Sequence, residues 1–192
     1  MPISGERRRE ILRAAMVVLA DRGYDKVTFD AVSELAHVSK PTLYRHWGSR
    51  FELLMDALRQ RSAEQHVADR GSLREDLLAL VLDESSIFAP VPFAAFCGMF
   101  AEVVRDRDAA EVFMRTFVEE QPSVATIWDR ARQRGEVGID VDSRLFTTAL
   151  FFGLVHVTLL EGQPFAPAPV ARVIDSVVLP GATSGSCNAS PA

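Results

Sequence analysis

The sequence predicts an all-α protein of about nine helices, with a small N-terminal unit and a larger C-terminal helical domain. Apolar residues recur at helical spacing through most of the 192 residues, and no alternating strand pattern interrupts them. Helix-start signals, in which Ser or Thr precedes Glu by three residues, occur repeatedly. We assign residues 1–50 to the N-terminal unit, 51–179 to the C-terminal domain and 180–192 to a disordered tail, because the last stretch is small, polar and aperiodic.

The first helix is expected over residues 6–22, where Ile11, Ala15 and Val18 share one apolar face and Gly23 follows as a stop signal. Four arginines lie on its outer side near the start. Cations at a helix N-terminus oppose the helix dipole. A phosphate partner and a solvated surface both explain them.

Two short helices joined by a tight turn are expected next, within residues 28–52. Thr28 and Ser39 are good N-cap residues, and Pro41 falls in the first turn of the second helix, where its missing N–H costs nothing. Gly48 is expected to end this helix as a C′ glycine. Ser49 begins another capping box and therefore another helix. This arrangement is the helix-turn-helix unit.

These residues resemble the N-terminal domain of the tetracycline-repressor (TetR) family of bacterial regulators. The resemblance covers roughly residues 7–55, and its most specific part reads VSKPTLYRHWGSR. Two positions depart from the family pattern. Trp47 replaces a common Phe, and His37 replaces the usual turn glycine, at a position that tends to need positive φ.

The resemblance implies double-stranded DNA as a partner, bound at a palindromic operator. Tyr44, His46, Thr28 and Arg50 would then hold phosphates. The residues nearest base edges would be Lys40, Pro41, Thr42 and Arg45. The full set of expected DNA-binding residues is Thr28, Ser39, Lys40, Pro41, Thr42, Tyr44, Arg45, His46 and Arg50.

The C-terminal helices are predicted from apolar periodicity between glycine and proline breaks. Arg130, Arg132 and Arg134, near the end of one of them, are expected to be solvated. The expected ranges are residues 49–68, 72–81, 93–105, a helix that includes 112–117, and then 124–134, 144–161 and 170–179.

An aromatic-rich stretch over residues 88–128 has two interpretations that the residues alone leave open. It can be a packed core or an apolar pocket between helices. The resemblance favours the pocket, because family members commonly bind a small-molecule effector in the C-terminal domain. The effector would be largely apolar. The candidate ligand-binding residues are Phe88, Phe93, Phe96, Phe100, Phe113, Phe117 and Trp128.

The predicted helices 144–161 and 170–179 are apolar on more than one face, so one face can serve a partner subunit. Gly153 would permit close helix approach. The resemblance implies a homodimer built through a four-helix bundle of these last two helices. The candidate interface residues are Phe146, Leu150, Gly153, Val157, Val173 and Val177.

The charge is unevenly distributed. Residues 1–50 hold nine Lys/Arg and six Asp/Glu, a balance of +3, within a chain whose net charge is -5. A basic head on an acidic body suits DNA binding at one end. Cys97 and Cys187 are far apart, which disfavours a disulfide framework and suits the cytoplasm. We expect no signal peptide and no membrane span, and we interpret the apolar run 145–160 as a buried helix.

Catalytic motifs are not found: the sequence has no Gly-rich phosphate loop, no HExxH, no CxxC and no GxSxG. We therefore expect no enzyme activity, no cofactor and no metal. The leading interpretation is a homodimeric transcriptional regulator, in particular a repressor released by its effector. A nucleoid-type DNA-binding protein without an effector, and a helical ligand-binding protein that has lost DNA binding, remain alternatives.

Overall fold

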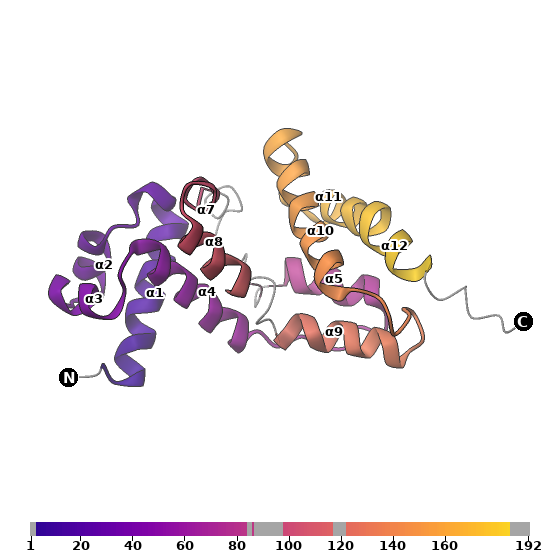
Figure 1. Cartoon of the computed structure of the whole chain (residues 1–192), viewed down its shortest axis with the longest axis horizontal. Helices are drawn as coiled ribbons and strands as arrows, with labels where there is room; N and C mark the ends of the chain where they lie inside the picture. The colour runs from indigo at the N-terminus through magenta and orange to yellow at the C-terminus, as the bar shows by residue number, and fades with distance from the viewer. Residues whose placement is uncertain (1–2, 84–85, 87–97, 117–121, 185–192) are drawn as a thin grey trace, which may run out of the picture. The chain divides into compact units, whose positions relative to one another are not determined.

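The computed structural model describes residues 3–83, 86, 98–116 and 122–184, and within these ranges every regular element is helical (Figure 1). The chain divides into two compact units. The first comprises Met1–Arg61 and Pro90–Phe117, and the second comprises Ser62–Ala89 and Val118–Ala192. The all-α prediction is confirmed. The predicted domain boundary after residue 50 falls inside the first unit, so that division stays a prediction.

The first unit begins with three helices and a short 3-10 turn packed around a common core. Ile11, Val32 and Leu43, one from each helix, are fully buried. Thr28 caps the second helix, because its Oγ1 accepts a hydrogen bond from the Ala31 N–H at 3.1 Å. The elements are α1 (Gly5–Arg22), η1 (Tyr24–Lys26), α2 (Phe29–Ala36), α3 (Lys40–His46) and α4 (Arg50–Glu64).

Two more short helices, α7 (Phe100–Arg105) and α8 (Arg107–Met114), complete the first unit. The Nη2 atom of Arg59 on α4 donates a hydrogen bond to Thr116 Oγ1, 3.3 Å away, just beyond α8. Side chains of α4 therefore connect the helix-turn-helix to α8.

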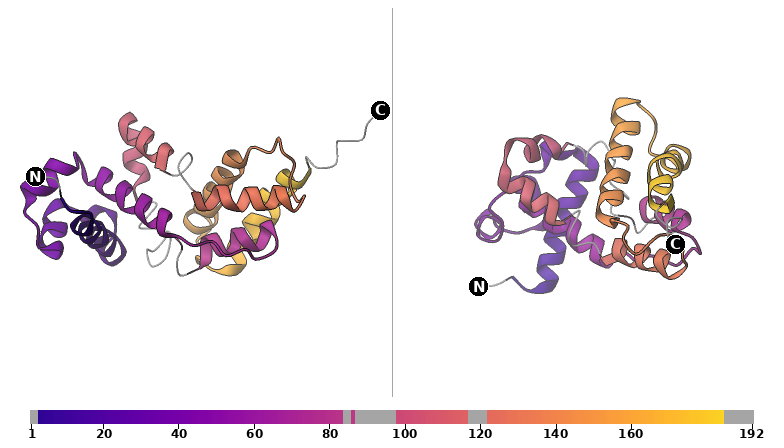
Figure 2. Two further views of the ribbon diagram at one scale, coloured as in Figure 1. Left: turned by 90° about the horizontal axis from the view of Figure 1, so that it is seen from below. Right: turned by 45° about the vertical axis from the view of Figure 1, so that its right-hand side comes forward.

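The second unit consists of a helix pair, α5 and α9, and a longer C-terminal group. Figures 1 and 2 show α10 and α11 side by side, and their contacts continue along the π-helical turn after α11. The elements are α5 (Leu73–Leu82), α9 (Pro122–Gln133), α10 (Ser143–Val155), the π-helical turn η3 (His156–Leu160), α11 (Pro167–Val173), the π-helical turn η4 (Ile174–Val178) and α12 (Leu179–Ser184).

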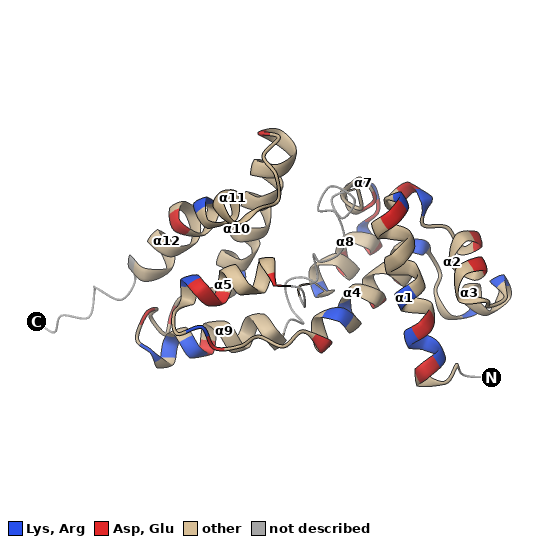
Figure 3. Ribbon diagram, turned by 180° about the vertical axis from the view of Figure 1, so that it is seen from behind, with Lys and Arg blue, Asp and Glu red and all other residues tan. Residues whose placement is uncertain are grey.

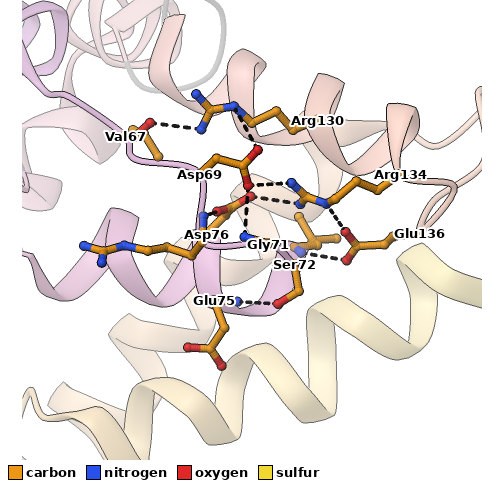
Figure 4. Close-up of polar contacts among 11 residues, drawn as sticks. Val67, Asp69, Gly71, Ser72, Glu75, Asp76, Arg130, Arg134 and Glu136 are labelled. Atoms are coloured by element: carbon orange, nitrogen blue, oxygen red, sulfur yellow. Dashed lines mark hydrogen bonds and ion pairs between the residues drawn. The ribbon is translucent and has the colours of Figure 1, made fainter.

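A polar network joins the start of α5 to the end of α9 (Figure 4). Asp76, in the first turns of α5, is fully buried. Its carboxylate accepts hydrogen bonds from the Arg70 N–H at 2.7 Å and from Arg134 Nη2 at 2.9 Å. Glu136 accepts from the Leu73 N–H at 2.6 Å. The acid at one helix N-terminus and the cation just beyond another helix C-terminus both complement the helix dipoles.

The prediction that the arginines near the end of α9 are solvated is wrong. Arg134 also pairs with Asp69 at 2.9 Å, and the Nη1 of Arg130 donates to the carbonyl of Val67 at 2.9 Å (Figure 4). Nη2 of Arg132 donates to the Val141 carbonyl at 3.2 Å. Guanidinium groups offer five donors, which is why they can satisfy several buried acceptors at once.

The interpretation of residues 145–160 as a buried helix holds for one face only. Leu150 and Leu154 are buried, whereas Leu145 and Phe152 are 61% and 52% exposed. The stretch Ser143–Leu160 is long and apolar enough to cross a membrane by length and composition, with 17% of it buried, and one such helix is weak evidence of a span. Large apolar side chains therefore remain exposed on the other face of α10.

The helical structure continues beyond residue 179, where the sequence indicated the start of a disordered tail. Residues 180–184 belong to α12. Gly181 lies so close to Phe146 that an added Cβ would come within 2.6 Å of the ring, and Ala182 is fully buried. Small residues, which made this stretch look like a tail, are what allows the helix to pack.

Candidate nucleic-acid interface

The turn between α2 and α3 is held by a residue from the start of α1. His37 adopts the left-handed conformation, with φ 51° and ψ 47°, as expected for a residue in the place of a turn glycine. Nη2 of Arg7 donates to the carbonyl oxygens of Ala36 at 2.8 Å and of His37 at 2.6 Å. Ser33 Oγ donates to the Val38 carbonyl at 2.5 Å. These bonds satisfy the carbonyls that the end of α2 leaves open.

The N-terminus of α3 is exposed and polar. Ser39 precedes α3 as predicted, yet its side chain accepts no capping hydrogen bond. Ser39 Oγ instead lies 2.8 Å from Thr42 Oγ1, and either hydroxyl can donate to the other. Lys40 pairs with Asp30 of α2 at 2.8 Å, which raises the pKa of the lysine by hydrogen bonding and charge attraction. Figure 3 shows acidic residues on α2 and basic residues on α3. Pro41 has no N–H, and the Thr42 N–H donates to the Ser39 carbonyl at 2.9 Å, so the exposed side chains of α3 are the main donors available to an anion at this end.

Tyr44 and Arg45 point away from the core of the first unit, and both side chains are exposed. The Tyr44 ring meets the Phe29 ring edge-on at 4.6 Å between centroids. That contact fixes the ring and leaves the phenolic oxygen to solvent, as a phosphate-binding hydroxyl requires. Together with exposed Pro41 and half-buried Thr42, these residues form the outer surface of α3.

The connection from α3 to α4 differs from the prediction. Helix α3 ends at His46, and Trp47 follows in an extended conformation with φ −134° and ψ 124°. Gly48 is therefore not a left-handed C′ glycine. Its N–H donates to Glu52 Oε2 at 2.7 Å, and the Glu52 N–H donates to Ser49 Oγ at 3.1 Å, which closes the predicted capping box one residue early. A buried Trp at the C-cap removes the need for a left-handed residue.

Arg50, at the first position of α4, is half-buried and engaged with the protein. Its guanidinium lies 4.4 Å from the Tyr24 ring centroid, and Nη1 donates to the Asp25 carbonyl at 3.4 Å. Glu102 of α7 lies 3.6 Å from Nη2, and burial raises the pKa of that carboxyl. Binding a phosphate through Arg50 would use donors that these weak contacts leave accessible. The other phosphate candidate at a helix start, Thr28, is exposed.

Sequence reasoning missed the residues that position this surface. Arg8 pairs with Asp56 of α4 at 2.5 Å, and the Trp47 indole N–H donates to the same carboxylate at 3.0 Å. The Arg8 guanidinium also lies 5.5 Å from the Trp47 ring centroid. Arg7 and Arg8 thus fasten α1 to the recognition elements. Their partners are 29 to 48 residues away, so no local pattern signals them.

The candidate ligand-binding residues fall in three places. Phe88, Phe93, Phe96 and Phe117 lie outside the described residues. In the first unit, Phe100 and Phe113 contact each other with centroids 5.2 Å apart. Trp128 belongs to the second unit, where it is fully buried and its indole N–H donates to Thr147 Oγ1 at 3.1 Å. The pocket therefore stays a prediction.

Most of the candidate interface residues pack within the chain. Leu150, Val157 and Val173 are buried within the chain. A Cβ built on Gly153 would overlap Cγ1 of Val173, so the close approach that this glycine permits is between α10 and α11 of one chain. Phe146 is half-buried beside Trp128 and Gly181, and Val177 is exposed.

Comparisons with known proteins agree with this geometry. Residues 11–57 match the family model described as bacterial regulatory proteins, tetR family, and residues 67–177 match the tetracyclin repressor-like C-terminal domain. The chain is 34% identical over 184 residues to a DNA-binding transcriptional repressor TetR of Mycobacteroides abscessus, covering 93% of this chain and 96% of that protein. It is 34% identical over 182 residues to the HTH-type transcriptional regulator AqdR of Rhodococcus erythropolis, covering 93% and 87%. A crystal structure of a TetR family transcription regulator matches with a TM-score of 0.72 and 25% identity, over 90% of this chain and 97% of that one.

Proposed function

Because the chain belongs to the TetR family of bacterial regulatory proteins, we propose that it represses transcription from a palindromic operator and is released by a small, largely apolar effector. Transcription regulation through a DNA-binding helix-turn-helix is common to the named relatives. The observation that carries the proposal is the surface of α3. Lys40, Tyr44 and Arg45 are exposed on this helix, and Arg7 holds the turn that precedes it. Residues 1–50 would be the DNA-binding domain and residues 51–179 the effector and dimerisation domain.

Two substitutions on α3 separate base reading from phosphate binding. Arg45→Ala should cost about 1–3 kcal/mol on the preferred operator and much less on other sequences, because a base contact is lost. Tyr44→Phe should weaken binding to every sequence by a similar factor, because only a phosphate contact is lost. Fluorescence anisotropy with DNA flanking the protein's own gene, compared with shuffled DNA, measures both effects.

Arg107→Ala is the matched control, since this arginine is exposed on α8, away from α3. If each α3 variant weakens binding to all DNA sequences by the same factor, the division of roles between Arg45 and Tyr44 is wrong. If the unmodified protein binds shuffled DNA as tightly as flanking DNA, the nucleoid-type alternative gains. If it binds neither, the chain is a ligand-binding protein that has lost its operator.

A homodimer accounts for the apolar face that α10 leaves exposed. Leu145 and Phe152 are seven residues apart, so both lie on one side of α10, and exposed Leu159 follows on the π-helical turn η3. The buried residues Leu150 and Leu154 lie on the opposite side. This stripe (Leu145, Phe152 and Leu159) extends the predicted interface to residues that the sequence did not single out. A partner subunit with the same stripe would cover it in a two-fold dimer.

The effector proposal rests on the aromatic residues of the stretch 88–128, which include Phe100 and Phe113. It is supported by the match of residues 67–177 to the tetracyclin repressor-like C-terminal domain. A ligand that favours one arrangement of the two DNA-binding heads by about 1–3 kcal/mol would weaken operator binding roughly 5- to 150-fold. Linkage is reciprocal, so operator DNA should weaken the ligand by the same factor. A thermal-shift screen of apolar compounds, followed by operator titration with each hit, measures both. If compounds bind tightly but leave the operator affinity unchanged, the aromatic residues form a packed core or a pocket that does not regulate DNA binding.

We further propose a cytoplasmic location and no catalytic activity, in keeping with a regulator that acts on the chromosome.

A further inference from the structure

A cavity of about 240 Å³ opens within the first unit, at the end of α3. Residues of α1, α4 and α8 form its other walls, together with the junction between α3 and α4. Of the expected DNA-binding residues, His46, assigned to a phosphate, lines it, and none of those assigned to base edges does. None of the aromatic residues assigned to the effector lines it either. Its lining residues are Arg8, His46, Trp47, Glu52, Met55, Asp56, Arg59, Val112 and Arg115.

The charged groups around this cavity favour an anion. Three guanidinium groups and two carboxylates line it, which gives these residues one net positive charge. Both carboxylates already accept hydrogen bonds from the protein. Asp56 accepts from Arg8 and from Trp47, and Glu52 accepts from the Gly48 N–H at 2.7 Å. Among the residues that line the cavity, guanidinium groups thus outnumber carboxylates.

His46 adds an independent observation. Its Nε2 atom is buried and has no hydrogen-bond partner among the described residues. Leaving a buried polar atom unpaired costs about 1–3 kcal/mol, so such atoms usually mark a missing partner. An oxygen atom inside the cavity that His46 lines would supply it. Guanidinium groups such as that of Arg115 bind carboxylate and phosphate oxygens through paired donors.

The remaining walls are apolar. The Trp47 ring, the buried Met55 side chain and Val112 offer contact to a short hydrocarbon part. The volume equals the share of about eight water molecules at roughly 30 Å³ each, which suits a small organic molecule rather than a drug-sized one. We propose that this cavity binds a small organic oxyanion, which is a carboxylate or phosphate with a short apolar group, between α8 and the end of α3. The inference goes beyond the apolar effector and does not depend on it.

Intrinsic fluorescence of Trp47 gives a direct test. Trp47 and Trp128 are the only tryptophans, so the full chain carrying Trp128→Phe reports on the cavity alone. Hexanoate has about the right size and is the first probe, and inorganic phosphate is the second. Hexan-1-ol provides the same chain without charge, and sodium chloride matches the ionic strength. We expect saturable binding of at least one oxyanion, with hexan-1-ol at least tenfold weaker than hexanoate if hexanoate binds.

Arg115→Gln in the same background should weaken oxyanion binding at least tenfold, because it removes a cation from the cavity wall. Arg107→Gln is the matched control, since Arg107 is an exposed arginine at the other end of α8, and it should leave binding within twofold. The proposal fails if the signal follows ionic strength alone, if hexan-1-ol binds as well as hexanoate, or if both arginine variants behave alike.

A DNA measurement without added anion separates a free ligand from a backbone phosphate. For a free oxyanion, Arg115→Gln should bind flanking DNA like Arg107→Gln. If Arg115→Gln instead weakens DNA binding, and the slope of log affinity against log salt concentration falls in magnitude by about one, the cavity receives a DNA phosphate. The proposal is then overturned. A chain that binds no DNA would refute the proposed function, while the hexanoate and phosphate isotherms would still decide this inference.

Discussion

Replacing Asp76 by alanine is expected to lower the free energy of unfolding by about 3–5 kcal/mol. The substitution removes a fully buried carboxylate that accepts from the Arg70 N–H and from Arg134 Nη2. Each donor left unpaired costs about 1–3 kcal/mol, and the lost volume adds to that. Urea unfolding followed by circular dichroism, at one fixed protein concentration, measures the change.

Two companion variants show whether burial explains the effect. Asp129→Ala removes an acid that pairs with Arg132 at 3.0 Å on the same helix pair, but this side chain is 66% exposed. Its cost should stay below about 1 kcal/mol, as for surface ion pairs. Asp76→Asn keeps an acceptor oxygen and the side-chain shape, so its loss should lie between the two. Equal costs for Asp76→Ala and Asp129→Ala would contradict the structural role of the network.

Local sequence signals predicted where several helices begin. The sequence did not reveal the long-range contacts. Thr28 and Ser72 accept the capping bonds that their positions imply, at 3.1 and 3.3 Å. Caps involve residues three apart, so a sequence displays them directly. The bonds from Arg7 to the turn and from Arg134 to Asp76 join residues 29 to 58 positions apart. An arginine at a helix end looks the same in sequence whether it is solvated or buried.

The DNA-binding residues proposed here come from a different kind of signal. Their run of types, VSKPTLYRHWGSR, is specific enough to name the family, and the roles proposed for the residues follow from that resemblance. The structure adds that Tyr44 and Arg45 are exposed, whereas Nε2 of His46 is buried and His46 lines a cavity with residues of α4 and α8. That difference depends on packing against α4 and α8, which no spacing within α3 encodes.

For α10, periodicity indicated two apolar faces without indicating which face meets which partner. Gly153 was a candidate for the interface because glycine permits two helices to approach closely. In the structure, the helix that approaches α10 at Gly153 is α11 of the same chain, through Val173. The stripe on the other side consists of large residues instead. Composition favours glycine as an interface marker, but exposure in the folded chain identifies the face that remains open.

Replacing Phe152 by glutamate is therefore expected to abolish the dimer. The charge would be buried without a partner at a two-fold contact, at a cost of about 3–5 kcal/mol, or more than 100-fold in dimer affinity. Operator affinity should fall with it, because a monomer engages one half-site and loses the second as an effectively intramolecular event. Sedimentation equilibrium gives the dimer constant, and anisotropy with flanking DNA gives the operator affinity.

Ile139→Glu is the control for an added charge at an exposed apolar residue, since Ile139 is 86% exposed in the loop before α10, and it should leave the dimer intact. Gly153→Ala separates folding from association. Its new methyl group would overlap Val173, so it should lower the free energy of unfolding by about 1–3 kcal/mol. Phe152→Glu should instead keep a native circular dichroism spectrum, because its side chain is half exposed in the single chain. A Phe152→Glu protein that stays dimeric would place the partner on another face, and the stripe on α10 would then need a different occupant.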